Sequence, residues 1–113
     1  MLMELLDLMR NRRSIRKYKI QTVPLEKIYS VLDAGRYAPS GANQQPWTYV
    51  LVIDTTLKQK IRIEAEKVET KYHKTAPLQL REWFKRQGIS PAKPFLTDAP
   101  ALIVVAGDTK APY

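Results

Sequence analysis

Apolar residues recur at intervals of three and four positions in four stretches of the chain, which predicts four amphipathic helices. Pro24 marks the beginning of the second helix, since proline fits the first turn of a helix. Gly88 marks the end of the fourth, since glycine commonly follows the last turn. Thr75-Ala76-Pro77 interrupts the periodicity between the third and fourth stretches. The predicted helices are residues 2–11, a segment from Pro24 to about residues 35–37, about Thr56–Tyr72, and Leu78–Arg86.

Two short runs of β-branched and aromatic residues predict strands at residues 47–53 and 101–106. Both runs are apolar nearly throughout, so we expect both strands to be buried. The long, mostly helical sequence between them excludes a tight hairpin. Because an isolated strand pair is marginally stable in water, the sequence predicts a single but partial α+β domain over residues 1–113. Its remaining strands and helices would come from a partner chain or from sequence not present here.

The composition bounds the class of protein. With 44% apolar residues the chain can form a core, and wholesale disorder is excluded. Without cysteine it forms no disulfide, and one histidine with scattered carboxylates leads us to expect no metal site. No apolar run approaches the ~20 residues of a membrane span. Glu4 and Asp7 interrupt the apolar N-terminus, unlike a secretory signal. We therefore expect a cytoplasmic protein with no membrane partner.

The formal net charge of +8 raises the question of a nucleic-acid partner. A basic balance points to nucleic acid only where cations gather on one face. Here lysine and arginine are spread along nearly the whole sequence. This distribution favours a solvated basic surface with a few anion-binding arginines, and a basic module for a polyanion stays open as the alternative.

Two polar segments carry the candidate chemistry. The arginine segment, Arg12-Arg13-Ser14-Ile15-Arg16, supplies three cations and a hydroxyl, a set suited to a phosphate and a polar ring edge. The polar turn, residues 38–47, holds amide and hydroxyl side chains between two prolines, and Gly41 in it permits a positive φ or the close approach of another molecule. Such a turn suits a flat heteroaromatic ligand. Taken singly, the first segment could be cations at a helix end and the second a stiff connection; together they favour a ligand site.

These two segments, with the helix that Pro24 opens and the strand that follows Pro46-Trp47, resemble the N-terminal half of the FMN-dependent nitroreductase family. The resemblance implies a helix and sheet sandwich and a homodimer with FMN at the subunit interface. It also implies electron or hydride transfer from NAD(P)H to an organic acceptor such as a nitroaromatic compound, a quinone or a halogenated tyrosine. The C-terminal half of the family, with further strands, a central helix and another flavin contact, is absent from this sequence.

The resemblance also implies roles for individual residues. The arginine segment would hold the phosphate, ribityl chain and pyrimidine edge of FMN through Arg12, Arg13, Ser14 and Arg16. In the polar turn, Ser40 and Gly41 would contact the isoalloxazine ring, with Pro39 in the same cofactor-binding set. Ala42 would lie where the substrate stacks. No catalytic residue is assigned.

A later part of the chain is similar to the iodotyrosine deiodinase branch of the family. In that branch a helical insertion, here residues 66–95, is a lid over the flavin, and Tyr72 and Lys93 match lid residues that grip the zwitterion of a halogenated tyrosine. The branch carries a glutamate four residues before this tyrosine, where the present chain has Val68. Glu69 shares a helix face with Tyr72 and could reach the same ligand. The residues that carry the similarity are Ile61-Arg62, Tyr72, Trp83, Lys93-Pro94-Phe95-Leu96 and Asp98-Ala99-Pro100.

Plainer interpretations stay open for several of these residues. Tyr72 falls on the apolar stripe of its helix and is also explained as a core tyrosine, and Lys93 as an ordinary exposed lysine. His73 lies between Lys71 and Lys74, and we expect it at the surface rather than in catalysis. For the whole chain, the alternative to an active enzyme is a truncated, non-catalytic member of the family.

Overall fold

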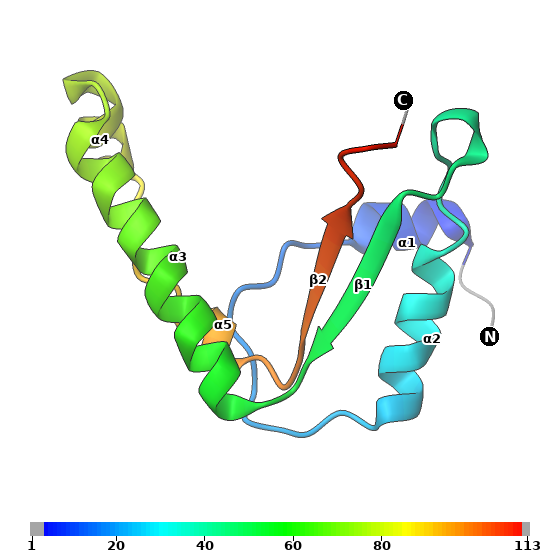
Figure 1. Ribbon diagram of the computed structural model, residues 1–113. Coiled ribbons are helices and arrows are strands. Elements are labelled where there is room, and N and C mark those ends of the chain that lie inside the picture. Colours follow the sequence, from blue (N-terminus) through cyan, green and yellow to red (C-terminus); the bar gives the residue numbers. More distant parts are fainter. Residues whose placement is uncertain (1–3, 112–113) are drawn as a thin grey trace.

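The computed structural model describes residues 4–111, which form five α-helices, one 3-10 turn and a pair of strands (Figure 1). The helices that the apolar spacing predicts are all present, and the first begins at Leu5; residues 2 and 3 of its predicted span lie outside the described residues. The elements are α1 Leu5–Asn11, α2 Leu25–Gly35, η1 Gly41–Asn43, β1 Trp47–Val52, α3 Thr55–Thr75, α4 Leu78–Arg86, α5 Phe95–Asp98 and β2 Leu102–Gly107.

The two strands pair antiparallel, from Trp47 opposite Gly107 to Val52 opposite Leu102. The backbone N–H of Asp108 extends the pairing by donating to the carbonyl of Pro46 at 2.7 Å. All of α3, α4 and α5 lie between β1 and β2 in the chain, so the predicted strand positions and the absence of a tight hairpin are both confirmed.

One helix is anchored to the strand pair by a close backbone approach. The Tyr49 hydroxyl on β1 donates to the carbonyl of Gly35 at the end of α2, at 3.0 Å. A Cβ atom at Gly35 would lie 3.0 Å from this hydroxyl oxygen, so a larger residue there would require the tyrosine to move by a few tenths of an ångström. α2 therefore runs beside β1, as Figure 1 shows.

The long helix α3 leaves the strand pair at the end of β1 and carries α4 at its far end (Figure 1). Asp54 caps α3, because its Oδ1 accepts from the backbone N–H of Leu57 at 2.6 Å. The return segment, residues 87–101, runs back from α4 along α3 and includes the short helix α5. The sequence pattern predicted only a proline-punctuated connection before residue 95, and it missed α5.

A buried ammonium group holds the return segment against α3. Only 6% of Lys58 is exposed, and its Nζ donates to the carbonyl oxygens of Ala99 at 2.7 Å and Thr97 at 3.4 Å. A cation favours this position because the carbonyl groups at the C-terminal end of a helix lack intrahelical partners. Lys58 thus anchors the residues immediately before β2.

The expectation of two buried strands is wrong for this chain. Val52 is the one buried residue of β1, and no residue of β2 is buried; Val105 is 60% exposed. The chain exposes 9855 Å², whereas a compact protein of its mass exposes roughly 6,300 Å². The physical reason is that one strand pair with helices beside it has no second layer to cover its apolar side chains. In residues 4–111 the buried apolar residues are Ile28, Val52, Ala76 and Ala99.

Replacing Lys58 by Met should lower the free energy of unfolding by about 1–3 kcal/mol, because the buried carbonyl oxygen of Ala99 loses its donor. Chemical denaturation measures this loss. Lys60→Met, on the exposed side of the same helix, is the matched control. Equal stabilities of the two variants, within about 0.5 kcal/mol, would contradict the anchoring role.

Candidate functional site

The arginine segment follows α1 as an exposed, non-helical stretch. Its hydrogen bonds are local: Arg12 Nη1 donates to Ser14 Oγ at 3.0 Å, and Arg13 Nη1 donates to the carbonyl of Arg10 on α1 at 2.8 Å. Arg16 Nη1 lies 3.5 Å from the Ser14 carbonyl. Within residues 4–111, none of its three guanidinium groups pairs with a carboxylate. The segment thus presents three uncompensated cations to solvent, which suits an anionic ligand.

The polar turn is held in a costly backbone conformation. The backbone φ angles of Ala42, Asn43 and Gln45 are 51°, 52° and 50°. Residues other than glycine rarely adopt this left-handed region. Ser40 Oγ accepts from the backbone N–H of Gln45 at 3.0 Å and closes the turn. The positive φ that seemed available to Gly41 falls at Ala42 instead. Strain of about 1 kcal/mol per residue is typical of segments that serve a ligand.

The two segments are not joined by polar contacts within one chain. No hydrogen bond or ion pair of residues 4–111 joins the arginine segment to the polar turn. The chain after the arginine segment instead runs toward α5 and β2, where Tyr18 lines an apolar cavity of about 500 Å³ together with Phe95 and Ile103. The polar turn lies at the end of the strand pair where β1 begins, just before Trp47 (Figure 1). It contains Pro39, Ser40, Gly41 and Ala42.

The predicted lid residues do come together. Lys93 Nζ, from the return segment, lies 3.5 Å from Glu69 Oε1 on α3. Tyr72 follows Glu69 on the same helix, is 50% exposed, and has its ring centroid 6.1 Å from that of Phe84 on α4. The structure therefore gathers Glu69, Tyr72 and Lys93 at the distal part of α3, and it leaves Ala42 apart from them.

A second carboxylate, which the sequence did not single out, positions Lys93. Glu66 Oε1 accepts from the backbone N–H of Lys93 at 2.7 Å and from Arg62 Nε at 2.8 Å. Arg62 Nη1 also donates to Thr97 Oγ1 at 3.0 Å. The backbone donor of Lys93 and then the Arg62 side chain lower the pKa of Glu66 below its ordinary value of 4.5. The spacing of four residues between Arg62 and Glu66 was the available signal.

His73 is not the surface residue that its lysine neighbours suggested. Its side chain is 15% exposed, and its ring stacks on Phe84 with centroids 4.5 Å apart and an interplanar angle of 22°. Its Nε2 lies 3.5 Å from Glu69 Oε2. The histidine thus belongs to the group of side chains around Glu69.

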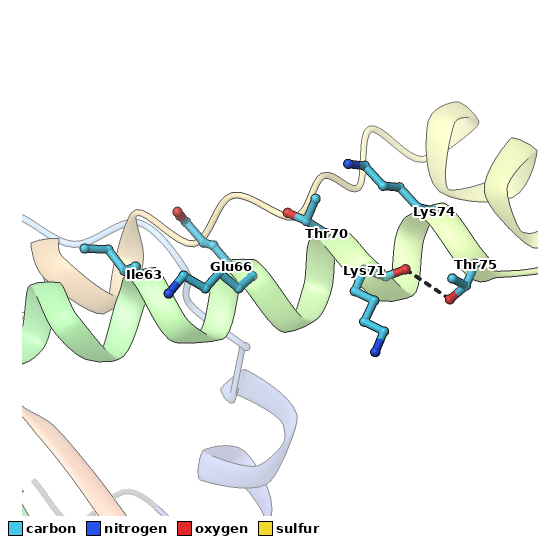
Figure 2. A pocket seen from close by; sticks show the side chains of 7 residues that line it. Ile63, Glu66, Thr70, Lys71, Lys74 and Thr75 are labelled. Carbon is cyan, nitrogen blue, oxygen red and sulfur yellow. Dashed lines mark hydrogen bonds between the residues drawn. The ribbon is translucent and has the colours of Figure 1, made fainter.

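A cavity of about 570 Å³ lies along α3, and the side chains around Glu69 do not line it (Figure 2). Glu66 and Thr70 line it, but Lys71 and Lys74 point away from one another in Figure 2, so their charges do not converge on one anion. Within residues 4–111, no three histidine or carboxylate side chains are grouped to hold a metal ion, and no helix there has the length and apolarity to cross a membrane.

Comparison with known proteins places the chain in a family. Residues 9–113 match the Nitroreductase family. The chain belongs to the nitroreductase family. This confirms the resemblance that the arginine segment and the polar turn carry, and with it the α+β fold class.

Individual nitroreductase-family relatives show how far the likeness extends. Iodotyrosine deiodinase from Thermotoga neapolitana is 37% identical over 109 residues, which are 96% of this chain and 59% of the relative. A crystal structure of oxidized iodotyrosine deiodinase bound to FMN and 3-iodo-L-tyrosine has a TM-score of 0.88 and 36% identity, over 97% of this chain and 60% of that one. A nitroreductase from Bacteroides fragilis with bound FMN has a TM-score of 0.67 and 28% identity, over 96% and 55% of the two chains. The chain therefore spans less than two thirds of each relative.

Glu66→Gln should destabilise this nitroreductase-family chain near neutral pH, and the difference from the parent should shrink in acid. Because the folded-state pKa of Glu66 is lowered, its carboxylate contributes stability that is complete above pH 4.5 and is lost as the pH falls through the folded-state value. Denaturation at a series of pH values between about 7 and 3 measures the difference.

The matched control is Glu64→Gln, whose carboxylate pairs with Lys67 on the exposed face of α3. It should be nearly neutral throughout. A Glu66→Gln variant as stable as the parent at neutral pH would contradict the role of Glu66 in holding the return segment.

Proposed function

We propose that the protein is an FMN-dependent oxidoreductase that reduces a halogenated tyrosine or a related aromatic acceptor with electrons from NAD(P)H. The observation that supports this most directly is the likeness, over 97% of the chain, to a deiodinase that holds FMN and 3-iodo-L-tyrosine. The pairing of Glu69 with Lys93 adds a local reason, because it sets opposite charges side by side next to Tyr72.

The arginine segment fits an FMN phosphate on its own chemistry. Arg12, Arg13 and Arg16 are exposed and lack carboxylate partners in the described residues, so a dianionic phosphate would gain charge-assisted hydrogen bonds without breaking an ion pair. Ser14 offers a hydroxyl in the same stretch. When bound, FMN supplies the transfer of electrons between reductant and acceptor.

The polar turn fits the flat ring of the same cofactor. Pro39, Ser40 and Gly41 precede the strained residues, and the bond between Ser40 and Gln45 fixes their backbone. A backbone fixed before the ligand arrives loses little conformational freedom on binding. In this proposal these residues lie against the isoalloxazine, and Ala42 faces the stacked substrate.

Assembly as a homodimer is part of the proposal, because no hydrogen bond or ion pair of the described residues joins the two segments within one chain. Large apolar side chains on α1 and β2 are exposed, among them Leu5, Met9 and Val105. Apolar side chains that gather into an exposed patch are typical of an interface. We propose that the completed FMN site lies where a second copy covers such surface.

Residues 66–95 form the lid in this proposal. Lys93 would receive the carboxylate of an amino-acid substrate, and Glu69 its ammonium group, so that the zwitterion takes the place of their mutual ion pair. Tyr72 is half exposed next to them and would cover the substrate from α3. The lid would exclude water from the reacting ring.

Arg16→Ala should raise the Kd for FMN by about 10- to 100-fold, the value of one charge-assisted hydrogen bond to phosphate. Quenching of flavin fluorescence on titration with protein measures it. Arg10→Ala is the control, since Arg10 lies on α1 and pairs with Asp7. Equal affinity of the two variants would contradict an FMN site at the arginine segment.

Lys93→Met should weaken binding of 3-iodo-L-tyrosine by about 10-fold while leaving the Kd for FMN unchanged, because it removes the cation opposite the ligand carboxylate. Calorimetry measures the FMN constant on the flavin-free protein and the 3-iodo-L-tyrosine constant on the FMN-loaded protein, with Lys60→Met as the control. Unchanged ligand affinity in Lys93→Met would remove Lys93 from the substrate site and leave the cofactor proposal intact.

A further inference from the structure

The carboxylate of Glu69 faces two basic groups that come from different parts of the chain. Its Oε1 lies 3.5 Å from Lys93 Nζ in the return segment. Its Oε2 lies 3.5 Å from Nε2 of His73, one helical turn further along α3. Each oxygen of the carboxylate therefore serves one partner, and the state of His73 bears directly on what Glu69 can offer to a ligand.

The imidazole of His73 is fixed in this position. It is mostly buried, and the ring of Phe84 on α4 stacks on it at 4.5 Å. The ring of Tyr72 meets the imidazole of His73 edge-on, with centroids 6.4 Å apart. The ring centroids of Trp83 and Phe84 are 5.8 Å apart. A ring packed in this way has little freedom to turn its nitrogen away from Glu69.

We propose that His73 is a positioning residue. Its charge decides whether the Glu69–Lys93 pair binds a zwitterionic ligand better than a ligand that carries only a carboxylate. The groups that face it are Glu69 on α3, Lys93 of the return segment through Glu69, and the uncharged ring of Phe84 on α4. With a neutral imidazole the charges of Glu69 and Lys93 cancel, which suits a zwitterion. With a protonated imidazole the three side chains together carry a net positive charge. This charge attracts a ligand that has a carboxylate alone and repels the ammonium group of a zwitterion.

The ligand measurement rests on the proposed function. It compares 3-iodo-L-tyrosine with 3-(3-iodo-4-hydroxyphenyl)propionate, the same molecule without its ammonium group, on the FMN-loaded protein. The ratio of their Kd values cancels the ionisation of the shared phenol. The ratio at about pH 5.5 should differ from the ratio at about pH 8 by about three- to five-fold, in favour of the propionate.

His73→Phe keeps a ring against Phe84 and removes the nitrogen that faces Glu69, and His73→Gln keeps a polar side chain that cannot be charged. In both variants the ratio should be independent of pH. A shift of the same size in either variant, or no shift in the parent, would overturn the inference.

A second measurement, without ligand, separates this inference from the proposed function. The protonated imidazole gains from both Glu69 and the face of Phe84, so amide hydrogen exchange in α4, corrected for the intrinsic rate, should be slower at about pH 5.5 than at about pH 8. The effect should vanish in His73→Phe. If neither ligand binds at any pH, the proposed substrate class is wrong, and the hydrogen-exchange measurement alone tests the role of His73. The same pH dependence of exchange in the parent and in His73→Phe would overturn that role.

Discussion

The attachment of the return segment to α3 is the constraint on which most of the structure depends. Two side chains on α3 provide it: the ammonium of Lys58 binds the carbonyls of Thr97 and Ala99, and the carboxylate of Glu66 binds the backbone N–H of Lys93. β2 begins shortly after Ala99, so the first anchor delivers the strand to its partner. The second anchor sets Lys93 opposite Glu69. Fold and candidate site therefore depend on the same few polar contacts.

A second constraint is the apolar surface that the described residues leave uncovered. The radius of gyration is 17.6 Å, whereas a compact chain of this length has about 13 Å. The excess comes from α3 and α4, which project away from the strand pair (Figure 1). The anchors on α3 are polar for this reason: they hold the return segment in place where little apolar burial is available to do so. A covering layer on α1 and β2 would add the burial that the strand pair lacks.

The positions of α1 to α4 and of both strands followed from the sequence, because periodicity is a local property that neighbouring residues express directly; the four-residue helix α5 is too short to show it. The burial of the strands did not, since an apolar run requires a covering layer but does not supply one. The anchors Lys58 and Glu66 were missed because each contacts residues far along the chain. In the site, Glu69 and Lys93 were identified through the resemblance to the family. The burial of His73 against Phe84 was not predicted, because it depends on how α4 folds back on α3.

The central claim is that the arginine segment and the polar turn hold one FMN in the assembled protein. The absorption spectrum of the purified protein after gel filtration, with the flavin quantified per chain, tests this most directly. We expect the bands of an oxidised flavin, which stay with the protein at one flavin per chain. A colourless protein that takes up no added FMN would contradict it.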